Sequence, residues 1–80
     1  MTKSEILANL ENQMKECYYN AALAEHNNDE FEVVDNYRRA ATIFETAGDL
    51  LGEGWLDRIT DAKVRARLDG VDQYRRLYNR

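Results

Sequence analysis

The residue types best suited to catalysis are scarce and scattered in this sequence. The 80-residue chain has one histidine, His26, one cysteine, Cys17, and one serine, Ser4. A catalytic nucleophile needs a neighbouring base, and a metal site needs several ligands at short spacings, such as His-x-x-x-His or a cysteine pair. None of the three residues has such a companion in the sequence. We therefore predict no catalytic residue, no metal ligand, no cofactor and no enzymatic activity.

Each of these residues has a simpler structural role at its position. Ser4 lies at a predicted helix start, Cys17 lies on an apolar stripe, and His26 lies at a predicted helix end, where a cation is favourable. The carboxylates are dispersed, and several stand four residues before a base, the order that favours ion pairs on one helix. These predicted pairs are Glu11 with Lys15, Asp35 with Arg39, Asp61 with Arg65, and Asp72 with Arg76.

Binding of another macromolecule is the chemistry that the C-terminal third favours. Residues 55–80 carry seven Lys/Arg and four Asp/Glu, whereas residues 1–54 carry four and eleven. Tyrosine, tryptophan and arginine dominate protein–protein hot spots. The arginines of this segment, including Arg65 and Arg80, could also contact nucleic acid. A pI of about 4.9 disfavours that alternative, because nucleic-acid-binding domains are usually basic. The predicted partner-binding residues are Trp55, Arg67, Tyr74, Arg75, Arg76 and Tyr78.

Two segments of the chain share a Tyr-Arg-Arg pattern, "DNYRRAA" at 35–41 and "DQYRRLY" at 72–78. A shift of 37 residues aligns their apolar positions, and this distance is near the period of helical-hairpin repeats. The same shift places the turn-like "HNNDE" opposite "KVRAR", which has no turn chemistry. Shared helical periodicity therefore explains the repeated Tyr-Arg-Arg pattern better than an internal duplication does.

These residues must be positioned by helices, because the chain has no proline, only four glycines, and apolar residues at alternating steps of three and four. We predict an all-α fold, a small three-helix bundle of antiparallel helices over residues 3–26, 29–52 and 55–79, as a single domain over residues 1–80. Thr2 and Glu5 form a possible capping box, and Asn28 or Asp29 a second N-cap. Gly52 or Gly54 ends the second helix, whereas close helix approach would explain Gly48 and Gly70.

The second helix has two adjacent apolar rows, one of which runs through Phe31, Val34 and Tyr37. A helix that is apolar on two faces is expected to lie between neighbours. We therefore expect the second helix to be the central one, with Tyr37 in the core.

The segment "AEHNNDEFEVVDNYRRAATIFETAGDLL" resembles the helical hairpin of tetratricopeptide-type proteins, with a small turn at 29–31 followed by Val34, Tyr37 and Ala41. With "DAKVRARLDGVDQYRRLYNR" as a third helix, roughly residues 15–80 are similar to microtubule-interacting-and-trafficking (MIT) domains. The turn "NND" replaces the usual glycine-aspartate, and MIT domains are normally attached to larger chains. The resemblance implies a peptide-binding groove lined by the third helix and carries over no catalytic residue.

Two functions fit these observations. The first is a non-enzymatic interaction module, which binds another protein or a second copy of itself through the Tyr/Arg-rich third helix. The alternative is a small acidic inhibitor of the kind carried by phages or mobile elements, which binds a host protein and blocks its nucleic-acid-binding surface. The sequence offers no apolar run of about 20 residues for a membrane span and no secretory signal, so we expect a cytoplasmic protein.

Overall fold

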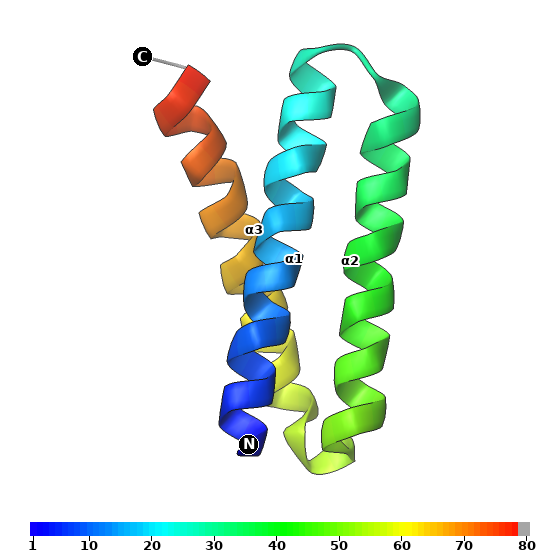
Figure 1. Cartoon of the computed structure of the whole chain (residues 1–80), viewed down its shortest axis with the longest axis vertical. Coiled ribbons are helices and arrows are strands. Elements are labelled where there is room, and N and C mark those ends of the chain that lie inside the picture. The colour runs from blue at the N-terminus through cyan, green and yellow to red at the C-terminus, as the bar shows by residue number, and fades with distance from the viewer. Residues whose placement is uncertain (79–80) are drawn as a thin grey trace.

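The helices begin and end close to the predicted residues. The computed structural model describes residues 1–78 and contains α1 (Lys3–His26), α2 (Glu30–Leu51), a short 3-10 turn η1 (Glu53–Trp55) and α3 (Leu56–Tyr78). The predicted end of the third helix at residue 79, and Arg80, lie outside the described residues. Consecutive helices run antiparallel, as Figure 1 shows, so the all-α three-helix bundle is confirmed.

Helix ends are fixed by the capping residues that the sequence predicts. The Thr2 hydroxyl accepts a hydrogen bond from the Glu5 amide, and the Glu5 carboxylate accepts one from the Thr2 amide, both at 3.1 Å. Asp29 is the N-cap of α2, and Asn28 before it has a left-handed φ of 57°, which asparagine tolerates. Gly52 ends α2 with a φ of 88°, a conformation that favours glycine. The predicted caps at Thr2, Asp29 and Gly52 are therefore confirmed.

The central helix is α1, whereas the sequence led us to expect α2 there. Most helix–helix contacts join α1 to α3 and α1 to α2, and few join α2 to α3. In Figure 1, α2 runs along one side of α1, and α3 crosses α1 so that its C-terminal half emerges on the other side. The Lys3 ammonium also donates a hydrogen bond to the Leu51 carbonyl oxygen at 3.1 Å, which ties the start of α1 to the end of α2.

The core is built on the predicted apolar stripe of α1. Met14 of α1 and Ile59 of α3 are fully buried. Small residues of α2 and α3 allow these two helices to lie close to α1. The closest approach is at Gly70, where an added Cβ would lie 2.8 Å from the Lys15 carbonyl oxygen. Gly70 thus fits the predicted close approach, but Gly48 does not, because no atom lies within 4 Å of its added Cβ. The remaining core residues are Leu7, Leu10, Cys17, Tyr18, Ala21, Ala24, Ala40, Ala47, Leu51, Ala62 and Ala66.

The predicted core face of α2 is rotated in the structure. Phe31 is 83% exposed, and Val34 and Tyr37 are also exposed, so the prediction that Tyr37 belongs to the core is wrong. The residues of α2 that are buried are Asn36, Ala40, Ala47 and Leu51. Only α1 covers α2 along most of its length, so only one of the two apolar rows can be buried.

Two of the four predicted ion pairs form. The Arg39 guanidinium lies 3.0 Å from the Asp35 carboxylate, and the Arg76 guanidinium lies 2.7 Å from the Asp72 carboxylate. Each pair joins residues one helical turn apart. Arg65 instead reaches Glu11 on α1 with two hydrogen bonds, at 2.8 and 3.3 Å. The predicted local pairs of Glu11 with Lys15 and of Asp61 with Arg65 are therefore wrong, because Glu11 and Arg65 pair with each other across the interface of α1 and α3. Within residues 1–78, no helix combines the length and apolar character required to cross a membrane.

Candidate partner-binding surface

The C-terminal end of α3 is held against α1 by an aromatic cluster. The rings of Tyr74 and Tyr78 stack with centroids 5.2 Å apart, and each centroid lies about 6 Å from the imidazole of His26 (5.9 and 6.0 Å). Hydrogen bonding to Tyr78 raises the pKa of Tyr19, so the Tyr78 hydroxyl also reaches α1. These four rings, Tyr19, His26, Tyr74 and Tyr78, are named the ring cluster below. The two predicted tyrosines therefore have an intramolecular role, although Tyr78 remains 47% exposed.

A second stripe of α3 points away from α1. Its members follow one another at steps of four, three, four and three residues, which places them on one helix face. Leu68 is 65% exposed and Val64 is 52% exposed, whereas the residues that α3 buries against α1 are Ile59 and small residues. We call this surface the outer stripe; it consists of Val64, Leu68, Val71, Arg75 and Tyr78, of which Tyr78, at the C-terminal end, turns back to contact α1 in the ring cluster.

Arg67 is exposed on α3, one helical turn from Val64 and from Val71. Its charge acts on the buried Tyr18 of α1, whose pKa is raised by burial and lowered in part by Arg67. On its other side, Tyr18 meets Tyr37 of α2 edge-on, with ring centroids 5.9 Å apart. Nearer η1, the Lys63 ammonium lies 4.9 Å from the centroid of the Phe44 ring. Cationic side chains of α3 thus lie close to aromatic residues of α1 and α2.

Trp55 lies at the opposite end of α3 from the ring cluster. Tyr74 lies 19 positions after Trp55, which corresponds to about 28 Å along a helix. Trp55 is half-buried against the core, and the Arg58 guanidinium lies 4.4 Å from the centre of its ring. The structure therefore brings Tyr74 and Tyr78 together, with Arg75 beside Tyr78 on the outer stripe, but leaves Trp55 apart. Arg76 pairs with Asp72 of its own helix.

The three residues considered for catalysis have structural surroundings. Cys17 is buried, and burial raises the pKa of its thiol, which keeps it protonated at neutral pH. His26 ends α1 and contacts the ring cluster, and Ser4 lies in the first turn of α1. No group of three or more His, Cys, Asp or Glu side chains within residues 1–78 is arranged to hold a metal ion.

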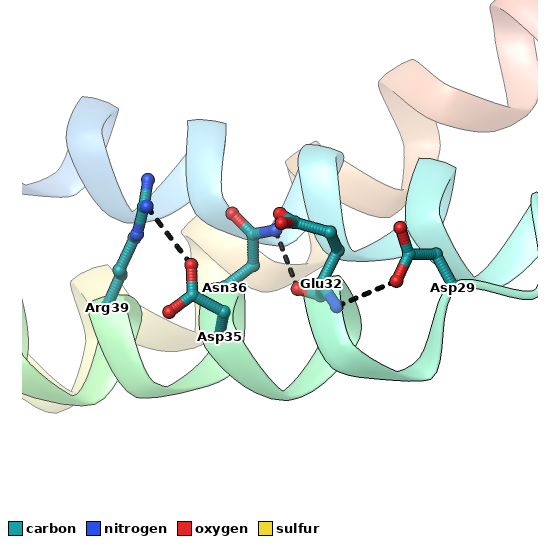
Figure 2. Close-up of polar contacts among 5 residues, drawn as sticks. All are labelled: Asp29, Glu32, Asp35, Asn36 and Arg39. Atoms are coloured by element: carbon teal, nitrogen blue, oxygen red, sulfur yellow. Dashed lines mark hydrogen bonds and ion pairs between the residues drawn. The ribbon is translucent and has the colours of Figure 1, made fainter.

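Polar side chains of α2 and its N-cap are joined by hydrogen bonds and an ion pair, as Figure 2 shows. Asn36 is buried and donates a hydrogen bond to the Glu32 carbonyl oxygen at 2.8 Å. The Glu32 amide in turn donates to the Asp29 carboxylate at 3.1 Å, and Asp35 pairs with Arg39. These bonds stay within α2 and its cap, so they stabilise the helix. Across residues 1–78, every buried side-chain nitrogen and oxygen has a hydrogen-bond partner.

The outer stripe is the part of this surface that the sequence analysis missed. Spacing alone does not separate Val64 and Leu68 from the buried residues of α3, because a buried stripe and an exposed stripe have the same spacing. Residue size is the sequence feature that distinguishes the outer stripe from the buried face of α3. The buried positions are small residues, Ala62, Ala66 and Gly70. The larger residues Val64, Leu68 and Val71 repeat on another face.

No family model, no curated protein and no solved structure matches this chain. The resemblance to tetratricopeptide-type and MIT domains therefore stays a prediction from the residues alone.

Proposed function

We propose that this chain is a non-enzymatic protein–protein interaction module, and that it binds another protein through the exposed side of α3. The observation that carries the proposal is the outer stripe. Val64 and Leu68 of this stripe are exposed and do not belong to the core, and exposed apolar side chains that gather on one face mark interaction sites more often than scattered ones do.

The chemistry of the outer stripe indicates the kind of partner. Arg67 and Arg75 flank Val64, Leu68 and Val71, so an apolar segment with carboxylates at its edges would be complementary. The ring cluster holds this part of α3 against α1 and so presents the stripe in one orientation. A surface ordered before binding loses less conformational entropy when the partner docks.

The proposal is tested by affinity capture from the native cell with matched variants. Leu68→Ser removes an exposed apolar side chain from the outer stripe, and Leu50→Ser removes one of similar exposure from α2. We expect both variants to fold, and we expect one protein species to be captured by the wild type and by Leu50→Ser but lost with Leu68→Ser. Equal capture by all three forms would overturn the proposal.

A second candidate function, the acidic inhibitor, is supported by the distribution of charge. Residues 16–37, which include the turn between α1 and α2, contain six carboxylates and no lysine or arginine. Such a surface would compete for a basic, nucleic-acid-binding face of a host protein. Binding would then weaken steeply as salt is raised. Capture that persists unchanged at high salt would exclude this candidate and leave the outer stripe as the binding surface.

A further inference from the structure

The outward face of α2 carries an apolar and charged strip that the fold leaves uncovered. Phe31 and Val34 are 83% and 50% exposed, and with Glu30, Asp35 and Arg38 they surround a shallow hollow of about 420 Å³. We call these five residues the α2 strip. Because α2 packs mainly against α1, this face lies on the outer edge of the molecule, as Figure 1 shows.

The two ends of the α2 strip have opposite charge. Glu30 lies in the first turn of α2, and Arg38 lies eight residues later, about 12 Å along the helix. Asp35 pairs with Arg39 at 3.0 Å, but in the chain up to residue 78 no ion pair engages Glu30 or Arg38. The strip therefore presents an acid, an aromatic and aliphatic centre, and a base, in that order.

We propose that the α2 strip is a self-association site, which binds the same strip of a second copy of this chain across a two-fold axis near Val34. A two-fold axis brings each residue of a patch against a different residue of the same patch. With the two α2 helices antiparallel, Arg38 of each copy meets Glu30 of the other, and Phe31 lies beside the stem of the opposite Arg38. Two ion pairs, two apolar contacts of Phe31 with the Arg38 stem and a central Val34 contact form at once.

The order of charges explains why a second copy fits better than an unrelated protein. A uniformly basic partner would meet Arg38, and a uniformly acidic partner would meet Glu30 and Asp35. Only a surface with the reverse order satisfies both ends, and an antiparallel copy of the strip has that order. The outer stripe of α3 lies on another helix, so self-association through α2 leaves it open to a different partner.

Charge reversal tests the arrangement, because its outcomes are specific to this pairing. The molar mass of the full chain is measured by light scattering and sedimentation over a wide range of concentration. We expect a dimer whose dissociation constant rises by about tenfold or more in Arg38→Glu and in Glu30→Arg, since each change sets like charges opposite each other twice.

The decisive sample is the equimolar mixture of these two variants. Each then supplies the charge that the other lacks, so a heterodimer should form, visible by native mass spectrometry as the mixed mass. The double variant Glu30→Arg/Arg38→Glu should dimerise with itself. Persistence of the monomers in the mixture would overturn the pairing.

Two further variants separate the α2 strip from the rest of the surface. Phe31→Ser should abolish the dimer, whereas Leu68→Ser, which alters the outer stripe, should leave it intact. Circular dichroism establishes that each variant is folded. A wild-type chain that stays monomeric at all concentrations, or a dimer lost with Leu68→Ser and kept with Phe31→Ser, would refute the proposal.

Discussion

Gly70 of α3 and Lys15 of α1 approach so closely that a Cβ on Gly70 would lie 2.8 Å from the Lys15 carbonyl oxygen. The same Cβ would lie 3.0 Å from the Tyr18 Cβ and from the Tyr19 amide nitrogen. All three atoms belong to the backbone of α1 or are fixed directly to it, so none can move without shifting the helix. The absence of a side chain at Gly70 thus sets how close α1 and α3 lie.

Gly70→Ala should destabilise the fold, although alanine is the better helix former. The gain in helix propensity is about 1 kcal/mol, whereas overpacking at a contact of this kind costs about 1–3 kcal/mol. Urea unfolding followed by circular dichroism would measure the difference. Gly48→Ala is the matched control, because nothing lies within 4 Å of its added Cβ, and it should stabilise the fold. A Gly70→Ala variant as stable as Gly48→Ala would show that the two helices can separate freely.

Ile59→Ala and Leu68→Ala should differ sharply in stability. Ile59 is fully buried, and its truncation should lower the free energy of unfolding by about 2–5 kcal/mol. Leu68 is 65% exposed, so its truncation should change the free energy of unfolding by about 0.5 kcal/mol or less. Thermal unfolding of the two variants gives the comparison. A large loss of unfolding free energy for Leu68→Ala would mean that the outer stripe is buried in an assembly of several copies of this chain.

Alkaline pH should weaken the fold through Cys17 and Tyr18. Burial raises the pKa of both groups above their ordinary values of 9.0 and 10.0. At about pH 7 both are protonated in the folded and unfolded chain, and their contribution is fully present. As pH rises further, the unfolded chain ionises first, so stability falls until the folded groups also ionise. Urea midpoints at about pH 8 and about pH 10 would show the loss.

The variants Cys17→Ala and Tyr18→Phe supply the control for this pH dependence. Each removes one of the two buried ionisable groups and should reduce the alkaline loss, whatever its effect at neutral pH. An unchanged profile in the variant that lacks both Cys17 and Tyr18 would assign the loss to other groups.

Asp29→Ala should cost about 1 kcal/mol of stability, because it removes the side-chain acceptor for the Glu32 amide at the start of α2. Asparagine caps helices as well as aspartate does, so Asp29→Asn should restore most of the loss. Chemical unfolding would compare the three forms. Equal stability of Asp29→Ala and the wild type would indicate that water replaces the cap.

The helix boundaries could be predicted because local chemistry fixes them. Thr2, Asp29 and Gly52 each act within a few residues of their own position, and the structure has all three in the predicted roles. The arrangement of the helices could not be predicted in the same way. Phe31 and Ala40 both lie on apolar rows of α2, and only the position of α1 decides which row is buried.

The candidate site was predicted in part for the same reason. Tyr74, Arg75 and Tyr78 lie together because they are near one another in the sequence, but the contact of both tyrosines with His26 depends on how α3 crosses α1. Trp55 was grouped with them by residue type alone, and its distance along α3 separates it. Arg65 was assigned to a local pair, since sequence spacing could not reveal Glu11 across the interface.

The central place of α1 has a consequence for the order of folding. The interface of α1 with α3 joins residues far apart in the chain, such as Glu11 and Arg65, which are 54 residues apart. During synthesis, α1 and α2 can form a hairpin early, but one side of α1 has no cover until α3 has been made. A chain shortened before Leu56 would therefore leave Met14 and Tyr18 without Ile59 and the small residues of α3. We expect such a fragment to be bound by chaperones or degraded, so premature termination would remove the protein rather than yield a smaller active form.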